Sequence, residues 1–257
     1  MKMRRVLIVL LVLYALLTAY PTIRHMLGQP SMGILTSFIT LAGFAFAVLH
    51  ASQREGWKRG LMLLALVIVV SLAFESVGVA TGLVYGPYHY TDKLGPKFLG
   101  LVPYLIPVAW FMMSYPAFVI ADLLIPSGWK RGQRLLSVAA VGGLVMTAWD
   151  LVMDPIMVSG GHWVWDTNGA YFGIPLQNFW GWWLTVFATY ALYMLISGKA
   201  VKTPEASFDR LALVSYVITM LGITLPTFLY GTGNLGLIGL FAMLPWVVAG
   251  WLKVAKE

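Results

Sequence analysis

The sequence predicts an all-α, polytopic integral membrane protein. About eight transmembrane helices form a single domain over residues 1–257, with the N and C termini on the cytoplasmic side. Hydrophobic residues make up 60% of the chain and charged residues only 11%, whereas a soluble domain carries about 25% charged residues. A soluble protein of this size could not bury so much apolar surface. The apolar residues also stand in long blocks, which is the pattern that a lipid bilayer selects.

Most of the apolar blocks reach the ~20 residues that are needed to cross ~30 Å of hydrocarbon. Each is predicted to be helical, because a segment inside lipid must satisfy its own backbone hydrogen bonds. The first block follows Lys2, Arg4 and Arg5, as the core of a signal peptide would. Residues 18–21 (Thr-Ala-Tyr-Pro) form a poor cleavage site, so we expect a retained helix. The blocks lie at about 6–23, 31–49, 60–84, 101–125, 135–158, 177–197, 211–230 and 235–252.

The basic residues gather on one side of the predicted membrane. Eight spans and a cytoplasmic N-terminus leave only Arg24, Lys93 and Lys97 on the far side. This asymmetry follows the positive-inside rule. It explains the net charge of +7 without a nucleic-acid partner, and we expect a multi-pass protein of the cell membrane. The basic residues on the cytoplasmic side are Lys2, Arg4, Arg5, Arg54, Lys58, Arg59, Lys130, Arg131, Arg134, Lys199, Lys202, Arg210, Lys253 and Lys256.

Several kinds of chemistry have no residues to carry them. The chain contains no cysteine, which excludes disulfides, thiolate nucleophiles and thiolate-bound metals. Its four histidines, at positions 25, 50, 89 and 162, are too scattered for a membrane di-iron site, and none is placed to bind haem. No glycine-rich phosphate loop follows a strand. We therefore expect no cofactor and no metal.

Two connections on the non-cytoplasmic side, residues 85–100 and 159–176, are rich in Gly, Pro and aromatic residues. They resemble each other at an offset of 75: Glu75 corresponds to Asp150, and residues 88–90 (Tyr-His-Tyr) correspond to Trp163-Val164-Trp165. This similarity predicts a parallel internal repeat of the third and fourth helices as the fifth and sixth. The alternative is chance likeness between two aromatic loops at the membrane interface. After a short gap, which reduces the offset to 73 and then 72, Gly100 matches Gly173, Pro103 matches Pro175, and Trp110 matches Trp182.

Ionisable residues inside lipid-spanning segments are costly and are candidates for function. The predicted spans contain four, Glu75, Asp122, Asp150 and Asp154, with no Lys, Arg or His in these spans to neutralise them. Asp122 lies three residues from the cytoplasmic end of its helix. We expect it to be structural or interfacial and within reach of water.

The other three carboxyl groups are predicted to form a cluster beneath the two aromatic loops. Asp150 and Asp154 are four residues apart and share a helix face, and Pro155 marks a kink or a cavity beside them. Glu75 is the repeat equivalent of Asp150. Clustered acids in a low dielectric resist ionisation, so at least one should keep its proton near neutral pH, as acid–base catalysis requires. The alternative is that they are hydrogen-bonded contacts between helices.

The motifs around these acids resemble those of the membrane carotenoid hydratase family. Its members include bisanhydrobacterioruberin hydratase and the 1′,2′-hydratase of γ-carotene-type pigments. The likeness covers most of the chain and is concentrated in residues 72–183, which lie within a predicted catalytic core of about 60–197. The motifs are Phe74-Glu75-x-x-Gly78, Gly82, Tyr85-Gly86-Pro87-Tyr88-His89-Tyr90, Trp149-Asp150-x-x-x-Asp154-Pro155, Gly161-x-Trp163-x-Trp165 and Phe172-Gly173-Ile174-Pro175-x-x-Asn178.

The resemblance implies a hydro-lyase, which adds water to the terminal C1–C2 double bond of an acyclic carotenoid without a cofactor. The substrate would be lycopene-like or bisanhydrobacterioruberin-like, together with water. Asp150 or Glu75 would then donate the proton, Asp154 would help to place the water, and Asn178 would hydrogen-bond it. Aromatic faces would stabilise the cation. These belong to Tyr88, Tyr90, Trp149, Trp163 and Trp165.

Two other functions remain open. An end-group cyclase or isomerase uses the same protonation; small membrane lycopene cyclases carry a Pro-Glu-Glu-like signature, and the Pro-Glu pair here is Pro204-Glu205 in a predicted cytoplasmic loop. A proton-coupled transporter or a pigment-binding scaffold also suits buried carboxyls and parallel repeats. Against transport, the acids lie near one face and have no basic partner. The sequence leaves open the oligomeric state, the exact carotenoid and whether one or both ends react.

Overall fold

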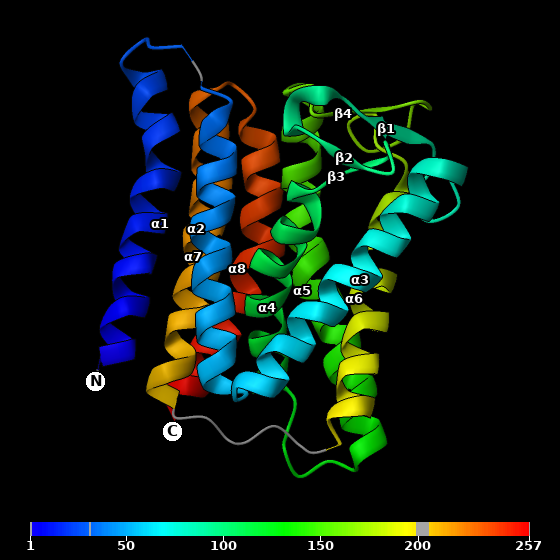
Figure 1. Cartoon of the computed structure of the whole chain (residues 1–257). Helices are drawn as coiled ribbons and strands as arrows, with labels where there is room; N and C mark the ends of the chain where they lie inside the picture. The colour runs from blue at the N-terminus through cyan, green and yellow to red at the C-terminus, as the bar shows by residue number, and fades with distance from the viewer. Residues whose placement is uncertain (1, 31, 199–205, 257) are drawn as a thin grey trace.

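The computed structural model describes residues 2–30, 32–198 and 206–256, and over these residues eight helices are long and apolar enough to cross a membrane. They run back and forth through one bundle, with both ends of the chain at the same end of the bundle (Figure 1). The predicted all-α, multi-pass architecture is confirmed. Which membrane the chain crosses stays a prediction. The helices are α1 (Lys2–Met26), α2 (Ile34–Arg54), α3 (Trp57–Thr81), α4 (Leu105–Leu124), α5 (Arg131–Ser159), α6 (Leu176–Ser197), α7 (Ala206–Leu229) and α8 (Gly233–Val254).

The loops at the end of the bundle opposite the two chain ends carry two small antiparallel sheets (Figure 1). Strand β1 (Tyr88–Tyr90) pairs with β4 (Trp163–Trp165), so that Tyr88 lies opposite Trp165 and Tyr90 opposite Trp163. Short strands β2 (Lys97–Phe98) and β3 (Val102–Pro103) pair with each other, after a 3₁₀ turn at Asp92–Leu94. The β1–β4 ladder joins the two aromatic loops that the sequence analysis compared.

The register of this ladder is the one expected if a two-fold axis relates the two loops. At the offset of 75, Tyr88 corresponds to Trp163 and Trp165 corresponds to Tyr90. Replacing both members of the Tyr88–Trp165 pair by these counterparts gives Trp163–Tyr90, which is also a pair of the ladder. The other matched aromatic residues, Trp110 on α4 and Trp182 on α6, stack with ring centroids 4.2 Å apart. The proposed duplication of α3–α4 as α5–α6 stays a prediction that both contacts support.

One tyrosine anchors the first aromatic loop between two helices. Gly82 ends α3 in the left-handed conformation (φ 72°), which lets the chain turn back at once. Tyr85 then inserts where glycines leave room, because a Cβ at Gly78 or Gly181 would lie 2.7 or 2.6 Å from its ring. Its hydroxyl meets the Thr185 hydroxyl at 2.8 Å. The aromatic strand β1 is thereby held over the ends of α3 and α6.

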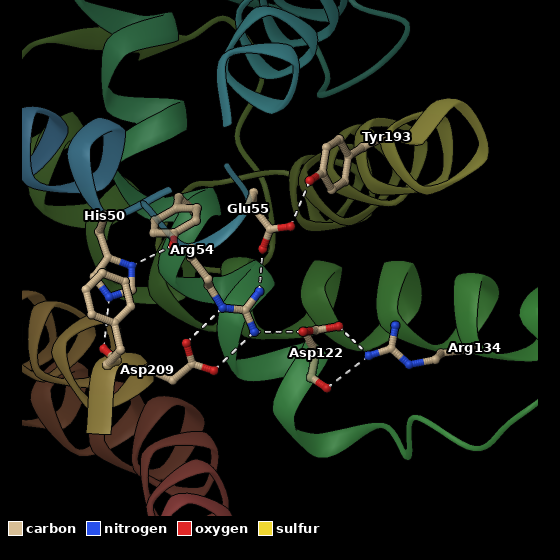
Figure 2. A network of polar contacts seen from close by, with 9 residues as sticks. His50, Arg54, Glu55, Asp122, Arg134, Tyr193 and Asp209 are labelled. Atoms are coloured by element: carbon tan, nitrogen blue, oxygen red, sulfur yellow. Dashed lines mark hydrogen bonds and ion pairs between the residues drawn. The ribbon is translucent and has the colours of Figure 1, made fainter. Parts of the chain in front are cut away.

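A buried ion-pair network occupies the opposite end of the bundle (Figure 2). Arg54 at the end of α2 donates to Asp209 on α7 at 2.8 Å, to Asp122 on α4 at 2.7 Å and to Glu55 at 2.6 Å. Arg134 of α5 also donates to Asp122. Five charged side chains therefore join four helices within the apolar bundle.

Two expectations for Asp122 are wrong. It is only 8% exposed, so it is shielded from water, and two arginines neutralise it. Helix α2 continues past the predicted end at residue 49, and α5 begins before the predicted start at residue 135. Arg54 and Arg134 therefore lie inside α2 and α5, although both positions fall outside the predicted spans. The structural role expected for Asp122 agrees with these contacts. The predicted cytoplasmic residues Lys199, Lys202, Pro204 and Glu205 lie outside the described residues.

The network also contains acids that the sequence analysis did not single out. Asp209 is fully buried, and Glu55 is almost so. Burial raises the pKa of the Glu55 carboxyl, and the neighbouring Arg54 guanidinium acts in the opposite direction. Tyr193 of α6 donates its hydroxyl proton to Glu55 at 3.0 Å, which adds a fifth helix to the network.

Candidate active site

Three carboxyl groups that have no cationic partner within the described part of the chain lie beneath the β1–β4 ladder. Glu75 comes from the outer half of α3, and Asp150 and Asp154 come from successive turns of α5. Their side chains are buried, with 3%, 0% and 1% exposed, respectively. The structure thus brings together the three acids that the sequence analysis grouped, at the end of the bundle opposite the arginines.

Glu75 accepts hydrogen bonds from three aromatic side chains. Tyr88 donates to Oε2, Tyr90 donates to the same oxygen at 2.9 Å, and the Trp110 indole donates to Oε1 at 2.9 Å. Burial, and next the Glu75 charge, raise the pKa of both tyrosines well above the usual value. The phenols therefore remain neutral donors, and the donor set around Glu75 suits an ionised carboxylate.

Asp154 is held by the second aromatic loop and by α6. The Trp163 indole donates to Oδ1 at 2.7 Å and the Trp165 indole at 3.4 Å. The amide of Asn178, in the first turn of α6, donates to Oδ2 at 2.8 Å. Each loop thus supplies two aromatic donors to a carboxyl of the helix that precedes it, tyrosines for Glu75 and tryptophans for Asp154.

Asp150 shares the same amide but has fewer donors. Asn178 Nδ2 donates to Asp150 Oδ2 at 2.8 Å as well as to Asp154. Within the described residues, Asp150 Oδ1 is buried and has no hydrogen-bond partner. One amide nitrogen therefore bridges two carboxyl groups, and Asp150 is the carboxyl of the three with the fewest donors.

Glu75 and Asp154 border a cavity of about 330 Å³. Asp150 does not line it, whereas the other predicted site residues all do. Trp110 and Trp182 also line the cavity, although the sequence analysis gave them no role in the site. Their match across the proposed repeat was the feature of the sequence that could have identified them. The predicted site residues on the wall are Glu75, Tyr88, Tyr90, Trp149, Asp154, Trp163, Trp165 and Asn178.

The cavity continues beyond the predicted core of residues 60–197. Side chains of α1, α2 and α7 complete its walls. At this side the Tyr14 hydroxyl meets the Thr219 hydroxyl at 2.6 Å and donates to Met112 Sδ at 3.9 Å. Most lining side chains are apolar or aromatic, so the space suits an apolar ligand. Across the described residues, no three His, Asp or Glu side chains are grouped to hold a metal ion.

The family described as "Carotenoid biosynthesis protein" matches residues 35–245. The chain belongs to this family. The match covers the carboxyl cluster, both aromatic loops and most of the cavity walls, and it confirms the family resemblance seen in the motifs.

A protein named bisanhydrobacterioruberin hydratase, from Haloarcula japonica, is 37% identical to the chain over 158 residues. The aligned part is 61% of this chain and 48% of that relative, so the match spans about half of the relative's length. No solved structure matches the chain.

Proposed function

We propose that the protein is a hydratase, which adds water to the terminal C1–C2 double bond of an acyclic carotenoid by acid catalysis. The observation that carries the proposal is the carboxyl cluster: three buried acids, with no cationic partner among the described residues, lie together, and two of them, Glu75 and Asp154, line an apolar, aromatic cavity. Membership of a carotenoid biosynthesis family and likeness to a relative named as a hydratase support it.

The proposed reaction needs only a carboxylic acid and water. The π electrons of the C1–C2 bond form a new C–H bond at C2 with the acid's proton, which leaves a tertiary cation at C1. Water then donates an oxygen lone pair to C1, and a carboxylate takes up the surplus proton. The alkene has gained one water molecule as an alcohol, and the acid is regenerated.

The arrangement of the three carboxyl groups gives them different roles in this reaction. Asp150 and Asp154 hold one proton between them, because two charges bridged by one amide repel each other. Asp154 delivers the proton, since it lines the cavity whereas Asp150 does not. This differs from the sequence-based expectation that Asp150 or Glu75 is the donor. Glu75 shares none of its three donors with another carboxyl, whereas Asp154 shares Asn178 with Asp150; Glu75 therefore stays ionised and faces the developing cation.

The aromatic walls stabilise the same cation. Tyr88 and Trp165 lie with ring centroids 5.0 Å apart, and Trp149 meets Trp182 edge to face at 5.8 Å. An aromatic face attracts a cation by about 0.5–2 kcal/mol, most strongly in a site without water. Tyr88 and Trp165 are held by hydrogen bonds to Glu75 and Asp154, and Trp149 and Trp182 by packing against each other, so the rings need no rearrangement when the charge forms.

Expression in a lycopene-producing host tests the function. We expect pigments heavier than lycopene by one molecule of water for each end that reacts, detected by mass spectrometry of the extracted carotenoids. Asp166→Asn serves as the control, because Asp166 pairs with His89 on the exposed surface of the loops; it should give the same products as the unaltered chain. New pigments of unchanged mass would instead identify a cyclase or isomerase. If purified protein in detergent produces no new pigment, a transporter or scaffold becomes the better assignment.

A further inference from the structure

The cavity is too small for a whole carotenoid. An apolar cavity of about 150 Å³ holds one benzene, which has six carbons, so 330 Å³ holds on the order of a dozen carbons. That is the reacting end and about two isoprene units. If the proposed function is right, most of the substrate must lie outside the cavity while its end reacts. The structure should then contain a route from the cavity to the lipid.

Among the helices that line the cavity, α1 is the least buried. It packs mainly against α2 and α7 at the edge of the bundle, as Figure 1 also shows. Only 17% of the residues in its most apolar stretch are buried, against 78% in α4. One face of α1, with Tyr14, Thr18 and Pro21, lines the cavity. The opposite face, with Leu16 and Tyr20, is exposed to the surroundings.

The seam between α1 and α7 has features that allow the two helices to separate. At Gly222 of α7, an added Cβ would lie 2.0 Å from Thr18 Cγ2, so at this position the two helices meet only through a threonine methyl group and a glycine. Pro21 of α1 and Pro226 of α7 both lie inside their helices and line the cavity. A proline removes one backbone hydrogen bond and weakens its helix locally. Nearer the middle of the bundle, the Tyr14–Thr219 hydrogen bond closes the seam.

We propose that an isoprenoid dissolved in the membrane enters the cavity end first between α1 and α7, and that the rest of its chain remains in the lipid during the reaction. The protein then recognises only the end group and the next few carbons of the substrate. The two ends of a long carotenoid would react in separate binding events, since each must be threaded through the seam in turn.

A disulfide across the seam tests the route. An ideal Cβ at Gly222 lies 3.5 Å from Thr18 Cβ, within the ~3.5–4.5 Å of natural disulfides, and the chain has no cysteine of its own. In the double variant Thr18→Cys/Gly222→Cys, oxidation should lower lycopene hydration at least tenfold, and reduction should restore it. The reduced double variant is the matched control, and each single cysteine variant should convert lycopene at the same rate before and after exposure to the oxidant. An oxidised double variant that converts lycopene as fast as its reduced form would overturn the proposed route.

A second measurement does not depend on catalysis. Lycopene bound in the seam should keep the two cysteines apart, so loading the reduced double variant with lycopene in detergent should slow disulfide formation several-fold. An unchanged rate of cross-linking would exclude a chain lying between α1 and α7. If the unaltered protein fails to hydrate lycopene, the proposed function fails. The protection experiment then still shows whether the seam admits an isoprenoid.

Discussion

Replacing Asp154 by Asn should reduce the formation of hydrated carotenoid by a factor of about 100 or more, since a positioned general acid contributes about 10²–10⁴-fold. An amide at this position cannot deliver the proton to the alkene. Asn keeps the size of the side chain and an oxygen that accepts from the Trp163 and Trp165 indoles. The rate of lycopene hydration by protein in detergent, quantified by chromatography, is the measurement.

Two comparisons separate this effect from a loss of structure. Asp166→Asn makes the same chemical change outside the cavity and should leave the rate unchanged. The Asp154→Asn protein should also insert into membranes and keep the helix content and thermal midpoint of the unaltered chain to within a few degrees. Full activity in this variant would remove Asp154 from the proton transfer and return the donor role to Asp150 or Glu75.

Replacing Arg54 by Met should lower the free energy of unfolding by about 3–5 kcal/mol, because removing one partner of a buried ion pair leaves the other charge buried and uncompensated. Figure 2 shows why: the guanidinium lies among the carboxylates of Glu55, Asp122 and Asp209, and all of its contacts are buried. Met keeps most of the apolar stem but leaves these acids without that cation. The measurement is equilibrium unfolding in mixed detergent micelles.

Lys58→Met is the control for this variant. Lys58 lies four residues further along the chain, at the same end of the bundle, and is exposed, so its replacement should change stability by no more than about 0.5 kcal/mol. If Arg54→Met unfolds at the same denaturant concentration as the unaltered chain, the network does not stabilise the fold. Its role would then have to be sought in the conformational behaviour of the bundle.

The sequence was sufficient for the features that depend on local composition. Lipid tolerates only long apolar segments with internal hydrogen bonds, so hydropathy alone indicated all eight helices. The cost of charge in hydrocarbon singled out Glu75, Asp150 and Asp154. Their grouping followed from helical spacing and from the match between the two aromatic loops. None of these steps needed knowledge of how the helices pack.

What the sequence by itself determined is therefore the membrane architecture, the family and the acids beneath the aromatic loops. The tertiary structure alone decided that Arg54 meets Asp209, that Asp154 lines the cavity whereas Asp150 does not, and that α1 and α7 complete the cavity walls. The physical reason is that these relations join helices distant in the chain. Hydropathy fixes where a segment crosses the membrane, but the rotation of each helix and its neighbours are set by side-chain packing and by hydrogen bonds between helices.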